Sequence, residues 1–280
     1  MTSSIVLAMQ CIRVAVTNGE ILTTTMIPEE SRPVFGPGPY VPIRETKRRK
    51  ALSKALTHAK ELKHPFTFAF ALSVAAIFES IVGSNRVAER YAAELAAIST
   101  EHGFPFYVAW ANLLQGRSLA ALGRSNEGFT LITNSFSMMR ATGAVLGTPF
   151  ALMMLAEVND ALGQPSVALN CVAEAVQIIE ANDERWLASE VFRLRGRLLK
   201  AGGDLAAAED SYSQAVAITR EQRAKLFELR AATDLARLWR DQGKRKEARE
   251  LLAPVYGWFT EGFDTLDLKE AKALLDELSP

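Results

Sequence analysis

The sequence predicts an all-α fold, an α-solenoid of helical hairpins with a 40-residue period. Two observations support this prediction. Glycine recurs in strict register every 40 residues, at Gly83, Gly123, Gly163, Gly203 and Gly243. A small residue stands seven positions before each of these glycines, and another stands five positions after it. A repeat of this length is typical of stacked helical units that share one continuous core.

The repeat between Trp186 and Arg223 shows how one unit is built. Its apolar residues from Leu187 to Leu198 are spaced four, three and four, which places them on one stripe of a helix. Gly203 then ends that helix, because glycine readily adopts a left-handed cap conformation. Asp204 is suited to be the N-cap of a second helix. Each unit is therefore predicted to be a helical hairpin with glycine at its bend.

The small residues indicate which kind of hairpin this is. Two helices approach closely only where side chains are small. These residues are Ala76, Gly116, Ala156, Gly196 and Ala236 before the glycines, and Ala88, Gly128, Ala168, Ala208 and Ala248 after them. The arrangement matches tetratricopeptide repeats, although their usual period is about 34 and a period of 40 lies nearer HEAT and armadillo repeats. We expect tetratricopeptide-like hairpins with lengthened helices; the HEAT or armadillo alternative stays open.

The two ends of the chain differ from the middle. Residues 45–280 are predicted to form the solenoid, with a partial first unit, five full hairpins and a C-terminal capping helix at 265–278. Residues 1–44 lie outside the repeat, and five prolines between positions 28 and 42 favour a poorly ordered arm over a regular helix. The predicted helix at 45–63 lacks its hairpin partner, so we expect an exposed apolar end and weak self-association there.

Composition excludes several functional classes. Lys+Arg and Asp+Glu both total 32, which favours neither a nucleic-acid nor a membrane partner, and the basic run Lys47–Lys50 is interpreted as a solvated helix start. No segment approaches the roughly 18 apolar residues of a membrane span. Two cysteines form neither a disulfide framework nor a metal pattern, so we predict a cytoplasmic protein without metal or cofactor.

The residue types needed for catalysis do not converge in the sequence. His64 and His102 stand at predicted turns, where capping or surface roles are usual, and His58 lies on the first predicted helix. Cys171 sits on an apolar helical stripe and is interpreted as a small core residue. No phosphate-binding loop is present, because the nearest glycine spacing, Gly123 to Gly128, lacks the lysine. The chain is therefore predicted not to be an enzyme.

Four stretches resemble a bacterial family of signalling proteins. They are "AKELKHPFTFAFAL", "ATGAVLGTPFALMMLAE", "LARLWRDQGKRKEARELLAPVYGWF" and the C-terminal "LLAPVYGWFTEGFDTLDLKEAKALLDEL". Members of the family join an adenylate/guanylate cyclase or another output domain to a signal-transduction ATPase and a C-terminal tetratricopeptide-like region. The resemblance covers about residues 45–280 and implies a regulatory role in a bacterial signalling system. The catalytic domains have no counterpart here, so no functional residue is transferred.

The predicted function is a non-catalytic protein-interaction or sensor scaffold that binds a partner segment in a groove lined by the first helix of each hairpin. The alternative is a MalT-like domain that senses a small molecule and controls a cyclase or ATPase. The tetratricopeptide register gives the groove candidates Trp110, Arg117, Arg193, Arg197, Lys200, Arg230, Arg237 and Arg240. Six of these eight are cations in the last two units, which favours an acidic protein or peptide partner. The alternative interpretation is that the arginines are solvated or pair with second-helix carboxylates such as Glu209.

Overall fold

The structure is a computed structural model that describes residues 45–279 of the chain. Within these residues it contains twelve helices and no strand, which confirms the predicted all-α solenoid fold. Contacts divide the chain into two compact units: unit 1 contains Arg49–Ala181, and unit 2 begins at Asn182. The predicted N-terminal arm lies outside the described residues. Its role in self-association, like the assignment of 45–280 to one domain, stays a prediction.

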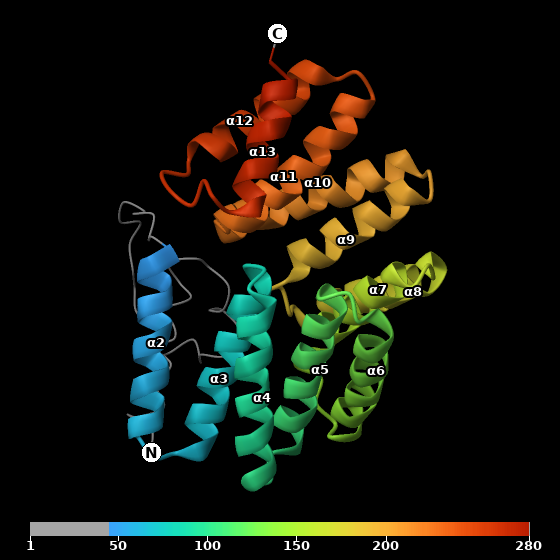
Figure 1. The fold of residues 1–280 in the computed structure, drawn as a ribbon. Coiled ribbons are helices and arrows are strands. Elements are labelled where there is room, and N and C mark those ends of the chain that lie inside the picture. The colour runs from blue at the N-terminus through green and yellow to red at the C-terminus, as the bar shows by residue number, and fades with distance from the viewer. Residues whose placement is uncertain (1–44, 280) are drawn as a thin grey trace. The chain divides into compact units, whose positions relative to one another are not determined.

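Helical hairpins form both units (Figure 1). Unit 1 contains α2 (Glu45–Glu61), α3 (Pro65–Ile81), α4 (Asn85–Glu101), α5 (Pro105–Ala121), α6 (Ser125–Ala141), α7 (Thr148–Ala161) and α8 (Pro165–Asn182). Unit 2 contains α9 (Ala188–Ala201), α10 (Leu205–Gln222), α11 (Lys225–Asp241), α12 (Arg245–Gly257) and α13 (Leu266–Glu277). The first helices of the five full hairpins are α3, α5, α7, α9 and α11. Helix α13 begins 41 residues after α11, which is the position of a further first helix.

The five glycines in register all end a helix in the left-handed conformation, with φ between 73° and 87°. Their role as turns between paired helices is confirmed. The left-handed residue in fact recurs every 20 residues, because the turn that leads into the next hairpin has the same form. Gly103 and Gly143 occupy that turn in two repeats, whereas Lys63, Asp183 and Arg223 occupy it in the others with φ of 49°, 54° and 56°. The 40-residue repeat is therefore two nearly equal helices that end in the same way.

Helix starts follow the local chemistry that the sequence indicates. Asp204 accepts a hydrogen bond from the backbone N–H of Ala207 at 3.1 Å, which confirms it as the N-cap of α10. Pro65 and Pro105 stand at the first positions of α3 and α5, where a missing N–H costs no helical hydrogen bond. Among residues 45–279, no helix is long and apolar enough to cross a membrane.

Paired helices touch at the small residues. The seven alanines in the set are all fully buried. The closest approach is between α5 and α6: a Cβ added at Gly128 would lie 2.6 Å from the carbonyl oxygen of Gly116, and one added at Gly116 would lie 2.6 Å from Cγ1 of Ile132. Backbone therefore packs directly on backbone in this hairpin.

We expect Gly128→Ala to destabilise the protein by about 1–3 kcal/mol, because the new methyl group must push α5 away from α6. Gly257→Ala is the matched control, since nothing lies within 4 Å of a Cβ at this position in α12. The control should be neutral or stabilising, because alanine favours a helix over glycine. Urea unfolding followed by circular dichroism measures both; equal stability of the two variants would contradict the close contact.

Candidate functional site

The groove candidates lie on the first helices of both units, and each unit is described by itself. In unit 1, Trp110 on α5 is only 5% exposed. Its ring packs beside Phe106, with centroids 5.9 Å apart, and beside Phe150 at 5.6 Å. The backbone of Gly147 closes the remaining side, because a Cβ there would lie 2.5 Å from the indole. Trp110 is therefore a core residue, and the expectation that it lines an open groove is wrong.

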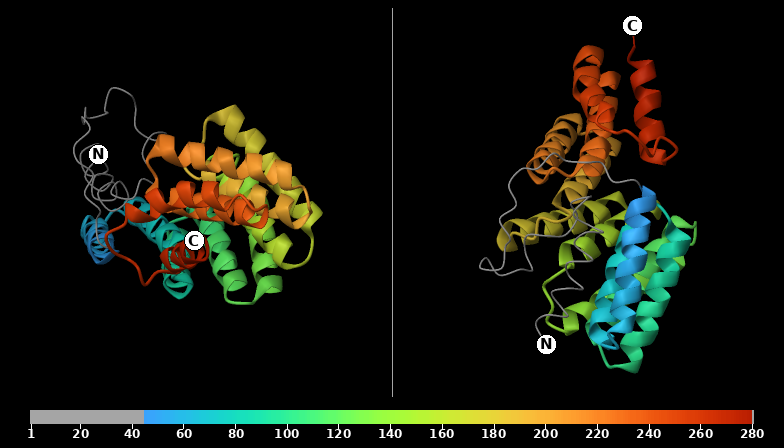
Figure 2. Two further views of the ribbon diagram at one scale, coloured as in Figure 1. Left: turned by 90° about the horizontal axis from the view of Figure 1, so that it is seen from above. Right: turned by 90° about the vertical axis from the view of Figure 1, so that its left-hand side faces the viewer.

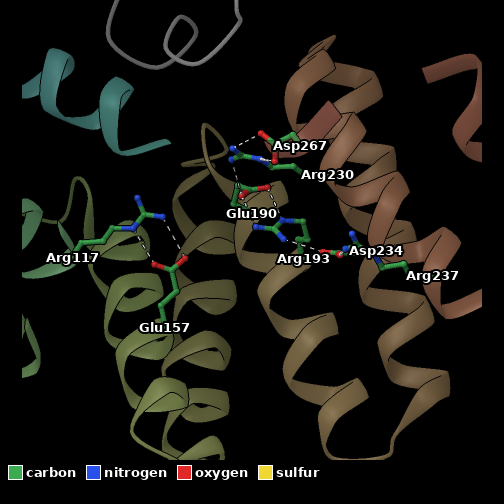
Figure 3. Close-up of polar contacts among 8 residues, drawn as sticks. All are labelled: Arg117, Glu157, Glu190, Arg193, Arg230, Asp234, Arg237 and Asp267. Carbon is green, nitrogen blue, oxygen red and sulfur yellow. Dashed lines mark hydrogen bonds and ion pairs between the residues drawn. The ribbon is translucent and has the colours of Figure 1, made fainter. Parts of the chain in front are cut away.

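Arg117 on α5 remains partly accessible, with 21% of its side chain exposed. Its Nε donates to Oε2 of Glu157 on α7 at 3.0 Å, one repeat further along the chain (Figure 3). A second guanidinium nitrogen donates to the hydroxyl of Ser80 on α3. Arg117 thus connects the first helices of three successive hairpins.

In unit 2, Arg193 and Arg230 form the centre of an ionic network. Arg193 donates to both oxygens of Glu190, at 3.0 and 2.9 Å, and to Asp234 on α11 at 2.9 Å. Arg230 makes two hydrogen bonds to Asp267 on α13, at 2.9 and 2.8 Å, and lies 3.7 Å from Glu190. Figure 3 shows Glu190 between the two arginines. The network therefore joins α9, α11 and α13.

These two arginines are largely buried, with 18% and 16% of their side chains exposed. Burial disfavours the charged form of Arg193, but Glu190 and Asp234 more than offset it, so the pKa of the guanidinium is raised above its ordinary value. Burial opposes the charge on Arg230 in the same way, and Glu190 and Asp267 again raise the pKa. Both arginines are therefore permanently charged supports of the network.

Three further cations pair with carboxylates at the edge of the network. Arg237 contacts Asp234 at 3.2 Å and Glu270 at 2.6 Å, with 32% of its side chain exposed. Arg240 pairs with Asp241 and with Glu277, and Lys200 pairs with Asp241 at 2.8 Å. The ionic surface, as we call it, comprises Glu190, Arg193, Arg197, Lys200, Arg230, Asp234, Arg237, Arg240, Asp241, Asp267, Glu270 and Glu277.

Arg197 is the exposed cation of this surface. It acts electrostatically on the hydroxyl of Tyr212, as do Arg193, Arg237 and Asp234. Burial, followed by the carboxylate of Asp234, raises the pKa of Tyr212, whereas the three arginines lower it. Tyr212 belongs to the second helix α10, and its ring rests against Gly196 of α9, where an added Cβ would lie 2.6 Å from the ring. This glycine allows the phenol to approach the face of the first helices.

The structure corrects the expected charge of this face. An unbalanced run of cations was predicted, but the ionic surface holds six cations and six carboxylates. The carboxylates come from first helices, not from the second helices. Glu209, the second-helix carboxylate considered above, instead accepts from Trp239 at 2.7 Å and pairs with Lys244 at 3.2 Å.

Opposite charges about one repeat apart are the sequence signal that could have found these partners. Arg117 and Glu157 are separated by 40 residues, and Arg193 and Asp234 by 41, as are Lys200 and Asp241. The acidic members fall one position outside the four groove positions in α11, so a search of those positions alone misses them.

The residues considered for catalysis have structural or surface positions. His64 is the N-cap of α3 and accepts from the backbone N–H of Thr67 at 3.3 Å. His58 forms an exposed contact with Glu61 on the surface of α2. Burial, and then the charge of Glu174, raises the pKa of the Cys171 thiol, which disfavours the thiolate. Among residues 45–279, no group of three His, Cys, Asp or Glu side chains is placed to hold a metal ion.

No protein-family model matches the chain, and neither does any curated protein. Solved structures do match it. A Rap protein in complex with competence and sporulation factor has a TM-score of 0.62 at 12% identity, over 85% of this chain and 63% of that one. NprR in complex with its cognate peptide NprX has a TM-score of 0.60 at 13% identity, over 83% and 65%.

A signal-transduction ATPase with a tetratricopeptide repeat sensor, from Pyrococcus horikoshii, has a TM-score of 0.57 at 13% identity. The match covers 83% of this chain and 37% of that one, so this chain spans less than two thirds of all three proteins. At these identities the likeness shows the fold, a tetratricopeptide-like α-solenoid.

Proposed function

We propose that the chain is a non-catalytic protein-interaction or sensor scaffold of a bacterial cytoplasmic signalling system, and that it binds a partner segment on the face of its first helices. The observation that supports this most is the ionic surface of unit 2. It presents Arg197 fully to solvent and leaves 32% of Lys200, 32% of Arg237 and 30% of Arg240 exposed on two neighbouring first helices. The peptide and protein factors in the similar Rap and NprR structures support the same class of partner.

The pairing within the surface defines how a partner would bind. Arg193 and Arg230 are buried in their pairs, so they support the surface and do not contact a partner. Arg197, Lys200, Arg237 and Arg240 are the contact residues. Exposed ion pairs contribute only about 0–1 kcal/mol each, so a partner carboxylate can replace an internal one at little cost. Charge-assisted hydrogen bonds from arginine would then give the complex its specificity. In unit 1, Arg117 is the corresponding accessible cation.

A small-molecule sensor of the MalT-like kind is the second candidate. It is supported by the likeness to the tetratricopeptide repeat sensor of the signal-transduction ATPase. It is also supported by the lone Arg117–Glu157 pair of unit 1, which lies beside buried apolar positions such as Leu113 and Met153. Sites for small molecules commonly combine apolar surface with a few polar groups.

Isothermal titration of the full chain separates the two candidates. The ligands are a pool of acidic peptides of about 15 residues, a pool of the same peptides with amides in place of the acids, and a panel of metabolites. We expect saturable binding of acidic peptides that weakens as salt is raised. Saturable binding of a metabolite without peptide binding would favour the small-molecule sensor. Binding of neither class would overturn the proposal.

A further inference from the structure

Helix α13 presents a row of carboxylates to the arginines of α11. Asp267, Glu270 and Glu277 stand at positions i, i+3 and i+10, which places them on one face of the helix. Asp267 pairs with Arg230 at 2.8 Å, Glu270 pairs with Arg237 at 2.6 Å, and Glu277 pairs with Arg240. All the carboxylates in this row are therefore directed at one neighbouring helix. Figure 2 shows α13 from two further sides.

Solvent exposure rises along this row of carboxylates. The Asp267 side chain is 25% exposed, that of Glu270 is 44% exposed, and that of Glu277 is 55% exposed. The arginine at the buried end, Arg230, is also held by Glu190. The N-terminal end of α13 is therefore anchored to unit 2, whereas the two later pairs are open to competing ions.

The same helix has an apolar stripe beside its acidic row. Leu268, Ala271 and Leu274 are buried, at 3%, 0% and 2% exposure, where α13 packs on α11 and α12. Helix α13 is thus an acidic amphipathic helix seated on a basic and apolar surface. Recognition of an amphipathic helix in a groove depends on this combination of anchors at helical spacing.

We propose that α13 is an internal occupant of the binding surface on α11, and that the external partner is an acidic amphipathic helix that displaces the C-terminal turns of α13. This inference rests on the proposed function, because it names the chemistry of the partner segment. An internal competitor lowers the apparent affinity for the partner by the fraction of molecules in which the site is occupied. Weakening the Glu270 and Glu277 pairs should therefore strengthen partner binding.

The test uses the full chain and a synthetic peptide with the sequence of residues 264–279. The variant Glu270→Gln/Glu277→Gln removes the two exposed pairs of α13. The variant Glu247→Gln/Glu250→Gln removes two exposed carboxylates from α12, with the same change in net charge. We expect the peptide to bind the α13 variant about fivefold or more tightly than wild type, which is the combined effect of two exposed ion pairs. The α12 variant should bind like wild type.

Two further measurements decide the role of charge and of displacement. A peptide with Asn or Gln in place of its acidic residues should lose binding, and amide hydrogen exchange within α13 should accelerate when the acidic peptide binds. Equal affinity of the α13 variant and wild type, or no binding by either, would overturn displacement of α13. Binding of the neutral peptide at equal affinity would overturn the acidic partner. The proposed function is judged separately by the peptide pool, so it can stand if α13 proves immobile.

Discussion

Replacement of Arg193 by methionine should destabilise the protein by about 3 kcal/mol. Arg193 is the cation between Glu190 and Asp234, whose side chains are only 10% and 14% exposed. Breaking a buried ion pair by removing one partner typically costs 3–5 kcal/mol, because the other charge stays buried without compensation. The lower end of that range applies here, since Arg230 and Arg237 still contact the two carboxylates.

Arg140→Met is the matched control for this prediction. Arg140 lies 3.8 Å from Glu174 in unit 1, and the two side chains are 64% and 46% exposed. Exposed pairs of this kind contribute less than about 1 kcal/mol. Chemical denaturation of both variants compares the two losses directly. A loss for Arg193→Met as small as that for Arg140→Met would show that the network does not hold the helices together.

Truncation of Tyr212 to alanine should destabilise unit 2 by about 3–5 kcal/mol, the usual cost of removing a buried aromatic ring. The ring is 2% exposed and fills the space that Gly196 leaves between α9 and α10. Its removal leaves a cavity that the paired helices cannot close without moving.

Tyr212→Phe separates the ring from the hydroxyl. This variant keeps the packing against Gly196 and removes the group on which the neighbouring arginines and Asp234 act. We expect it to retain most of the stability that the alanine variant loses. If the phenylalanine variant were as unstable as the alanine variant, the polar contact of the hydroxyl would be the main contribution, not ring packing.

The helical hairpins could be predicted because glycine is needed at a left-handed turn, and the 40-residue register exposes that need. The 20-residue half-period was hidden, since Lys63, Asp183 and Arg223 adopt the same conformation without being glycine. Their side chains carry no signal of a left-handed turn. The tertiary structure imposes it, at a cost of about 1–2 kcal/mol for each such residue.

The candidate site was predicted only in part. The register placed the cations on the correct first helices, because position within a repeat fixes the face of a helix. It did not identify Asp234, Asp267 or Glu270 as their partners, since pairing across repeats depends on how neighbouring helices are offset. It also failed for Trp110, which the backbone of Gly147 covers. Such local packing is set by the loop before α7, not by the periodicity.

The most direct test of a binding role for the ionic surface compares two pairs of substitutions. Arg197→Gln/Arg237→Gln removes two accessible cations from the first helices, and Lys246→Gln/Arg249→Gln removes two exposed cations from the second helix α12. The measurement is the Kd of an acidic peptide selected from the pool, at low and at physiological salt. We predict at least about tenfold weaker binding and a shallower salt dependence for the first variant only, as expected for lost charge-assisted contacts. An unchanged Kd in the first variant, or an equal loss in both, would contradict the proposed site.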